Sequence, residues 1–146
     1  MALPEFNEHG DLPAGVYRAT LEECCARFGK VNDRRQAVTA RFLQICNLAR
    51  ATGKLDRLVV FGSYVTDKPA PRDIDIILIM RDDFDMRTCD KTTKALFDHR
   101  QAEVRFGASV FWIRPALLLN ETLESFVAHW QTKRDTGQRG IVEVVL

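Results

Sequence analysis

Two short apolar runs in the middle of the chain predict two buried β-strands. The first covers residues 58–61 and stops at Gly62, and the second covers residues 76–80, after a loop with two prolines and the residues 73–75 that lead into it. Runs of this length that are rich in β-branched residues and bounded by Gly and Pro are typical of strands buried on both faces. We therefore expect residues 58–80 to form the centre of the fold.

Apolar residues at helical spacing predict four helices around these strands. Thr20, with Glu23 three residues later, has the pattern of a capping box at the start of a helix. Asn32 opens a long amphipathic helix that Gly53 ends, and Arg35 lies among its polar positions. The four predicted helices cover residues 20–28, 32–52, 91–100 and 120–130, with Asp90 and Asn120 as the caps of the last two.

The remaining segments complete an α+β pattern. Two further strands are expected over residues 104–113 and 140–146, and Gly107 marks a bulge or bend in the first of them. Residues 1–19 contain Pro and Gly at short intervals, which predicts an extended, irregular arm pinned on the body of the domain. We expect a single domain over residues 1–146, with a mixed β-sheet and helices packed mainly on one face.

Asp73 and Asp75 stand at the start of the second predicted strand. Side chains in a strand alternate between its two faces, so these carboxylates point the same way while Ile74 points to the other face. Two charges at the mouth of an apolar strand are costly unless a cation neutralises them, and Mg²⁺ is commonly held by one or two carboxylates together with substrate phosphates. We predict a metal site here; the alternative is a solvated turn into the strand.

The Gly62-Ser63 pair, with nine residues between it and Asp73, supplies the other half of the candidate site. Gly lets the backbone approach a ligand closely, and N–H groups that open the next turn can hold phosphate. Without the acids, this pair would be only a turn at a strand end. Lys68 and Arg72 lie in the intervening loop and are candidates for pairing with phosphate; otherwise they face solvent or offset the acids.

Composition and charge narrow the function classes without selecting one. The chain has 146 residues, of which 28% are charged and 46% hydrophobic, and its formal net charge is +1. These values are ordinary for a soluble globular protein, and the balanced charge gives no reason to expect a nucleic-acid or membrane partner. Lys133, Arg134 and Arg139 make the last part of the chain basic; we expect a solvated face, with a phosphate or RNA contact as the alternative.

The cysteines and the N-terminal residues point to a cytoplasmic protein. Cys24, Cys25, Cys46 and Cys89 include no CxxC pair and the histidines are scattered, so a structural zinc site is not expected. We predict that the thiols are reduced and buried or half-buried. The first residues lack the pattern of a secretion signal, and no apolar run reaches the roughly 20 residues that span a bilayer.

Gly62-Ser63, nine residues and then Asp73-Ile74-Asp75 between apolar strands resembles the signature of the nucleotidyltransferase superfamily, whose fold is similar to the polymerase-beta palm. Its small single-domain members are the minimal nucleotidyltransferases. More narrowly, the whole chain resembles a bacterial family of short nucleotidyltransferase-like proteins of largely unknown function. The features that carry this second resemblance are Phe6, Asn7, Gly10, Leu12 and Pro13 in the arm, residues 20–23, GSYVT at 62–66, and the final WQTKRD and GIV segments.

The resemblance implies a metal-dependent phosphoryl-transfer site. Asp73 and Asp75 would hold Mg²⁺ or Mn²⁺, and Gly62 and Ser63 would contact the triphosphate of an NTP. The implied reaction moves a nucleotidyl group onto a hydroxyl of a protein or of an RNA such as tRNA, and pyrophosphate leaves. Small members of this superfamily often act in toxin–antitoxin or defence modules, which implies a cognate toxin or antitoxin protein as a partner.

One residue expected from this resemblance is missing. Active members of the superfamily usually present a third carboxylate from a neighbouring strand, and the matching place here, near Ser109, holds no acid. The nearest acid is Glu103, and either Glu103 or water would have to complete the site for catalysis. The alternative is an inactive protein of this fold that serves as an antitoxin-like binding partner. A more distant alternative is an RNA-binding module that uses the basic tail.

Overall fold

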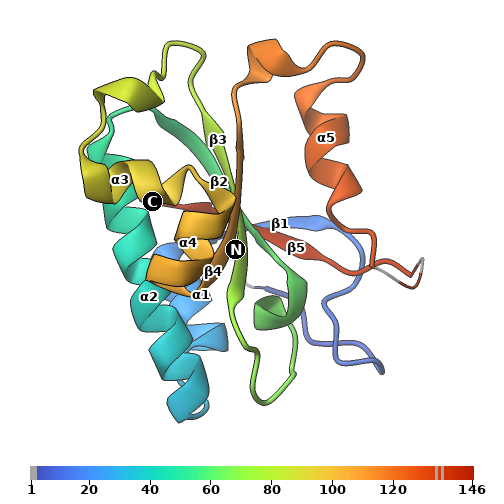
Figure 1. The fold of residues 1–146 in the computed structure, drawn as a ribbon. Coiled ribbons are helices and arrows are strands. Elements are labelled where there is room, and N and C mark those ends of the chain that lie inside the picture. The colour runs from blue at the N-terminus through green and yellow to red at the C-terminus, as the bar shows by residue number, and fades with distance from the viewer. Residues whose placement is uncertain (1–2, 134, 136) are drawn as a thin grey trace.

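A five-stranded mixed β-sheet forms the centre of the molecule (Figure 1). The computed structural model describes residues 3–133, 135 and 137–146. The strands are β1 (Val16–Thr20), β2 (Leu55–Phe61), β3 (Ile74–Met80), β4 (Ala108–Ile113) and β5 (Ile141–Val145). In the sheet order β1-β5-β2-β3-β4, the central strand β2 runs antiparallel to both of its neighbours, whereas the pairs β1–β5 and β3–β4 are parallel.

Helices cover the two faces of this sheet unequally (Figure 1). The helices are α1 (Leu21–Phe28), α2 (Asp33–Ala51), α3 (Lys91–Leu96), α4 (His99–Phe106) and α5 (Leu123–His129). The first four contribute to one large core, while α5 packs over a smaller cluster on the opposite face. This arrangement confirms the predicted α+β class, with a mixed sheet and helices mainly on one side. None of the described helices is both long and apolar enough to cross a membrane.

The alternation of side chains along β3 decides where the candidate acids lie. Alternate residues from Ile74 onward are buried in the large core. Ile77 and Ile79 point the other way, into the smaller cluster under α5. Because every second residue of a strand shares a face, Asp73 and Asp75 belong to the α5 side. The acids therefore lie on the side of the sheet that helices cover least.

Local capping signals act as predicted at the first two helices. Thr20 Oγ1 accepts a hydrogen bond from the Glu23 N–H (3.1 Å), and the Thr20 N–H donates to Glu23 Oε1 (3.0 Å), which completes the capping box. Asn32 Oδ1 accepts from the Arg35 N–H at 2.9 Å and caps α2. These bonds join residues three positions apart, so the sequence alone is enough to predict them.

The prediction of a strand over residues 104–113 was wrong for the first part of that range. Residues 104–106 form the last turn of α4, and Asp98 caps the start of this helix by accepting from the Gln101 N–H at 3.0 Å. Gly107, predicted as a bulge or bend within the strand, instead ends α4 in the left-handed conformation with φ of 59°. The break before Asp98 also divides the predicted 91–100 helix into α3 and α4. A few apolar residues cannot distinguish the end of a helix from the start of a strand.

The N-terminal arm is pinned on the domain, but its last part is not irregular. Val16–Thr20 forms the edge strand β1, paired in parallel with β5, and this short strand has only a weak pattern of its own. Earlier in the arm, the Arg27 side chain donates to the Pro4 carbonyl at 2.8 Å and stacks over the Phe6 ring. The helix α5 also begins two residues later than predicted, because its cap is Thr122 and not Asn120.

The cysteines are free thiols, as predicted. Cys24 and Cys46 are buried, and Cys25 and Cys89 are half-buried. Burial raises the pKa of the Cys24 and Cys46 thiols above its ordinary value, so both stay protonated at neutral pH. These side chains act as small apolar residues of the core.

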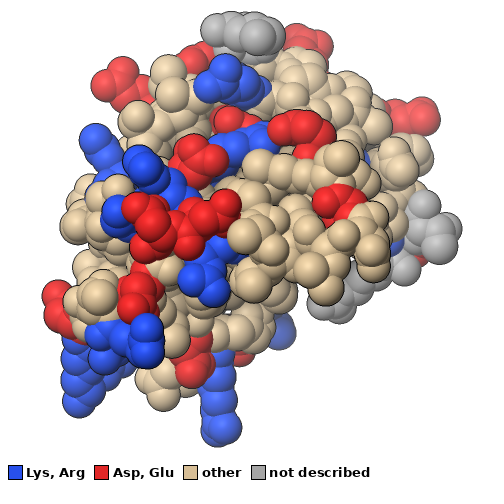
Figure 2. All heavy atoms as spheres, turned by 90° about the horizontal axis from the view of Figure 1, so that it is seen from above, with Lys and Arg blue, Asp and Glu red and all other residues tan. Residues whose placement is uncertain are grey.

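Acidic and basic side chains alternate at the end of the sheet where β3 leaves it. Figure 2 shows this end with red and blue side chains interleaved rather than gathered by sign. Among the pairs here, Lys54 Nζ lies 2.6 Å from Asp83 Oδ2, and Arg87 lies 3.0 Å from Asp85. Exposed pairs of this kind add little stability. The end of the sheet drawn in Figure 2 therefore presents no field of one sign that would attract a nucleic acid.

A buried arginine holds the segment that follows β2. Arg35 is only 2% exposed and donates to four backbone carbonyls. These carbonyls lie at the end of α1, in the short 3₁₀ helix η1 (Gly62–Val65), and in the loop before β3. They belong to Phe28 (3.0 Å), Tyr64 (2.8 Å), Thr66 (2.7 Å) and Lys68 (2.6 Å).

The hydrogen bonds of Arg35 extend to a buried pair of hydroxyl groups, those of Thr39 and Tyr64. Thr39 Oγ1 donates to the Arg35 carbonyl at 2.7 Å and lies 2.6 Å from the Tyr64 hydroxyl. Since the hydroxyl hydrogen of Thr39 is used on that carbonyl, Tyr64 acts as the donor in the second bond. The sequence pattern placed Arg35 among the polar positions of its helix, and nothing in it distinguishes Arg35 from the exposed Arg34 beside it.

We expect Arg35→Lys to lower the free energy of unfolding by about 3 kcal/mol, because one ammonium group cannot reach the carbonyls that the guanidinium fork satisfies. Urea unfolding followed by circular dichroism measures the loss. Arg34→Lys is the matched control and should stay within about 0.5 kcal/mol of the native protein. Similar small losses in both variants would show that the four carbonyls do not depend on Arg35.

Candidate functional site

A cleft of about 370 Å³ lies on the α5 side of the sheet, beside the end of β2. Asp75 and Ser109 contribute to it from β3 and β4, and Phe61 and Gly62 from the end of β2 and the turn after it. Its other lining residues are Phe111 of β4 and residues from α4 and from the segment that follows α5. Two of the residues predicted from sequence, Gly62 and Asp75, thus line one cleft.

Three neighbouring strands bring the acids together with Ser109. In the register of the sheet, Asp75 lies opposite Phe61 of β2 and opposite Ser109 of β4. Ser109 Oγ donates to Asp73 Oδ2 over 3.2 Å. The place where the resemblance leads us to expect a third carboxylate is therefore beside both acids, and it holds a hydroxyl.

Gly62 makes room for the carboxylate of Asp75. Its backbone has φ of 77°, in the left-handed region that favours glycine. A Cβ atom at this position would lie 2.0 Å from Asp75 Oδ2, well inside contact distance. The close approach predicted for this glycine is therefore an approach to Asp75, which places the acid directly against the turn.

The other predicted phosphate contacts do not line the cleft. Lys68 and Arg72 are exposed in the loop before β3, and the backbone of Lys68 serves as an acceptor for Arg35. Ser63 is half-buried, and its carbonyl accepts from the Thr66 N–H (3.2 Å) and hydroxyl (2.7 Å). A sequence spacing can place these residues in the right loop, but it cannot show which way the loop turns.

Lys133 and Arg139 are cations that line the cleft, and they come from the far end of the chain. Lys133 Nζ lies 3.0 Å from Asp11 Oδ2, and Arg139 Nη1 lies 3.4 Å from Asp11 Oδ1. Asp11 belongs to the N-terminal arm and is only 4% exposed. Arg134, the third member of the predicted basic tail, lies outside the described residues. Sequence reasoning missed Asp11 because its partners are more than 100 residues away.

A histidine–glutamate pair and three aromatic rings also line the cleft. His99 Nε2 lies 3.0 Å from Glu103 Oε1, and its Nδ1 lies 3.2 Å from the Val110 carbonyl. The spacing of four residues on a helix is the signal that pairs His99 with Glu103. The aromatic rings belong to Phe61, Phe111 and Trp130, with centroids 4.8 to 6.2 Å apart.

The donor set suits a hard cation bound together with phosphate. Among the residues that the structure describes, no group of three or more His, Cys, Asp or Glu is arranged to hold a metal ion. Asp73, Asp75 and Ser109 offer only oxygen atoms, which suit Mg²⁺ or Mn²⁺. Two carboxylates hold such an ion when phosphate oxygens and water complete its shell. The residues present therefore fit a metal that arrives with a nucleotide, and they do not form a protein-only cage.

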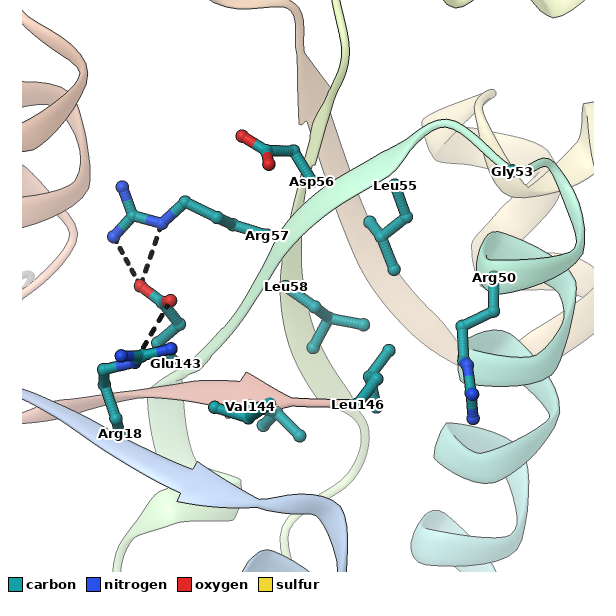
Figure 3. Close-up of a pocket in the computed structure, with 11 residues that line it drawn as sticks. Arg18, Arg50, Gly53, Leu55, Asp56, Arg57, Leu58, Glu143, Val144 and Leu146 are labelled. Carbon is teal, nitrogen blue, oxygen red and sulfur yellow. Dashed lines mark hydrogen bonds and ion pairs between the residues drawn. The ribbon is translucent and has the colours of Figure 1, made fainter.

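A second cleft, of about 350 Å³, lies where β2 begins, and Figure 3 shows how its charges are used. Arg57 and Arg18 both point toward Glu143 (Figure 3), with Arg57 Nε 2.9 Å and Arg18 Nε 3.7 Å from its carboxylate. Arg57 also donates to Glu124 of α5 at 2.9 Å. These contacts fasten α5 to the sheet, so we assign this cleft a structural role and place the candidate site at the other end of β2.

We expect Gly62→Ala to destabilise the protein more than Gly53→Ala does. Both glycines have positive φ, which costs about 1 kcal/mol for alanine, but a Cβ at Gly53 meets nothing within 4 Å. The contact with Asp75 should add about 1–3 kcal/mol at Gly62. Urea unfolding of both variants measures the difference, which Asp75→Ala in the same chain should abolish. Equal losses at the two glycines would contradict the close packing of Asp75 on the turn.

The comparisons with known proteins identify a family without assigning it a function. A family described as a family of unknown function, DUF6932, matches residues 4–145, which include the arm, the sheet and the basic tail. The searches of curated proteins and of solved structures returned no match. Asp11, Asp75, Ser109 and Arg139 all fall within the matched residues. Since the match spans nearly the whole sequence, the chain belongs to this family of unknown function, DUF6932.

Proposed function

We propose that the protein binds a nucleoside triphosphate together with Mg²⁺ or Mn²⁺ and transfers its nucleotidyl group to a hydroxyl of a protein or RNA acceptor, tRNA included. The observation that carries this proposal is the gathering of Asp73, Asp75 and Ser109 on one face of the sheet, against the Gly62 turn. Carboxylate oxygens on one face of a sheet are ligands that Mg²⁺ and Mn²⁺ accept together with phosphate oxygens. A metal–nucleotide complex matches this donor set.

The cleft and the residues beside it offer contacts that would suit the metal and the base of such a ligand. Asp73 and Asp75 would hold the metal, which when bound supplies positive charge to the phosphates. Ser109 orients Asp73 through its hydrogen bond. Phe111 lines the cleft and is 37% exposed as a residue, so its ring is a candidate on which a nucleobase would stack.

The proposed reaction needs one base. The acceptor oxygen forms a bond to the α-phosphorus, the bond from that phosphorus to the β-phosphate bridging oxygen breaks, and pyrophosphate leaves with the electron pair. The acceptor hydroxyl loses its proton. Glu103 lines the cleft and is paired with His99, so this pair is placed to accept that proton.

The setting we propose is the cytoplasm of a bacterium, within a toxin–antitoxin or defence module. The free, partly buried thiols are consistent with a reducing compartment. The cognate toxin or antitoxin protein would then be either the acceptor or a binding partner. These assignments rest on the resemblance of residues 62–75 to nucleotidyltransferases.

Label transfer tests the proposed reaction. The purified protein is incubated with Mn²⁺ or Mg²⁺, each NTP labelled at the α-phosphate, and a bacterial lysate that supplies acceptors. We expect labelled protein or RNA to form, and Asp73→Asn with Asp75→Asn to reduce labelling by about 100-fold or more, because the metal loses both charged ligands. Asp56→Asn, an exposed aspartate at the other end of β2, is the control. Labelling that the double variant retains would contradict the proposal.

A second candidate function follows from the hydroxyl at Ser109. A site with two carboxylates where three are expected favours a protein that binds a metal–nucleotide complex, or a partner protein, without catalysing transfer. Such a protein would act as the neutralising half of a two-protein module. Nucleotide binding without label transfer would favour this second candidate.

We expect Ser109→Asp to raise the affinity for Mn²⁺ by about 10-fold, because a third carboxylate then faces the two acids. Isothermal titration of the variant and the native protein with Mn²⁺ measures this. Ser125→Asp, an exposed serine on α5, controls for the added charge. Unchanged Mn²⁺ affinity would show that position 109 does not face the metal site. If the native protein transfers no label and the Ser109→Asp variant does, the missing acid is the cause of the native protein's inactivity.

A further inference from the structure

We propose that Lys133 and Arg139 bind the polyphosphate of the ligand and that Asp11 positions them. We call these three residues the cationic clasp. This inference rests on the proposed function for the identity of its ligand, and it assigns the anion contacts to residues other than Lys68 and Arg72. A nucleoside triphosphate, with its triphosphate as the recognised group, is the chemical class that the clasp would take.

The clasp has an excess of one positive charge at the cleft. The single carboxylate of Asp11 is shared, with one oxygen 3.0 Å from Lys133 and the other 3.4 Å from Arg139. The carboxylate side chain is 6% exposed, whereas the side chains of Lys133 and Arg139 are 25% and 26% exposed. The buried acid is therefore covered by the two cations, and the cations keep part of their surface open to the cleft that they line.

Backbone contacts hold both halves of the clasp. On the arm, the Asp11 N–H donates to Asn7 Oδ1 at 3.1 Å, and Asp11 forms a β-bridge with Thr66, just after the turn at Gly62. On the tail, the Lys133 N–H donates to the Gly137 carbonyl at 2.7 Å, and the Arg139 N–H donates to the Gln131 carbonyl at 2.9 Å. The backbones of both cations are thus held by hydrogen bonds within the tail.

The position of the clasp suits the charge of the ligand. A triphosphate carries more negative charge than one divalent ion at Asp73 and Asp75 can neutralise, so further cations are needed near it. Lys133 and Arg139 line the same cleft as Asp75 and Gly62. Lys68 and Arg72 are exposed outside this cleft. Guanidinium and ammonium groups held by a buried acid are pre-oriented, which reduces the entropy lost when phosphate binds.

The decisive experiment compares two variants with the same changes in charge. Asp11→Asn, Lys133→Gln and Arg139→Gln together remove the clasp without leaving a buried unpaired charge. Asp67→Asn, Lys68→Gln and Arg72→Gln make the same changes in the exposed loop that the sequence favoured. Both variants and the native protein are titrated with ATP plus Mg²⁺, and separately with inorganic triphosphate in the absence of metal.

We expect the clasp variant to bind each ligand at least about 10-fold more weakly, the effect of losing charge-assisted hydrogen bonds, and the loop variant to change by less than about threefold. A clasp variant that binds as tightly as the native protein overturns the inference. If the native protein transfers nucleotide while the clasp variant binds normally, the inference fails and the proposed function stands. If the native protein binds triphosphate through the clasp but transfers no nucleotide, the proposed function fails and the inference stands.

Asp11→Asn alone gives an independent test. Without the carboxylate, Lys133 and Arg139 repel each other, so the melting temperature of the ligand-free variant should fall. Inorganic triphosphate then meets cations that Asp11 no longer positions, so it should raise the melting temperature less than it does in the native protein. An equal or larger rise would show that Asp11 does not position these cations for the anion.

Discussion

The structure depends on one guanidinium group placed inside the core. Arg35 satisfies backbone carbonyls from the end of α1, from η1 and from the loop before β3, segments that have no regular ladder to satisfy them. Burial lowers the pKa of Arg35, yet a guanidinium stays charged in this setting. A buried cation with five donors can define the path of an irregular segment such as residues 64–68. The turn at Gly62 leads into this segment, so the bonds of Arg35 also constrain the chain that leaves the candidate site.

The cleft collects opposite charges that are distant in sequence. Asp75 enters from β3, and Lys133 and Arg139 from the tail. Behind them, Asp11 of the arm pairs with both cations, and Asp73, just before β3, accepts from Ser109. Asp11 forms a β-bridge with Thr66, just beyond η1, so the N-terminal arm is attached to the chain that follows the Gly62 turn. A ligand with several negative charges and a bound divalent cation can satisfy both the acids and the partly open cations of such a cleft.

The number of carboxylates at the candidate site bears on whether it only binds a metal–nucleotide complex or also catalyses transfer. Ser109 occupies the register position beside Asp75 and donates to Asp73, so it stabilises the acid pair without adding a negative charge. Two carboxylates suffice for a metal that shares its shell with phosphates, whereas a second metal needs further oxygen ligands. Glu103 is the acid that the cleft offers nearby, and its partner is His99. The chemistry of the site therefore depends on whether this pair serves as base or as ligand.

The sequence by itself determined the apolar cores of two strands, at residues 58–61 and 76–80, and the capping box of α1, because these follow from contacts within a few residues or from the pattern of one strand. It also determined the α+β class. The approach of Gly62 to Asp75 depends on the register of β2 with β3, which sets Phe61 opposite Asp75. Tertiary structure decided the burial of Arg35, the end of α4 at Gly107, the turning of Lys68 and Arg72 away from the cleft, and the meeting of Asp11 with Arg139. Those outcomes depend on which distant groups can satisfy one another's charges and hydrogen bonds. Local sequence patterns do not show which distant residues will meet.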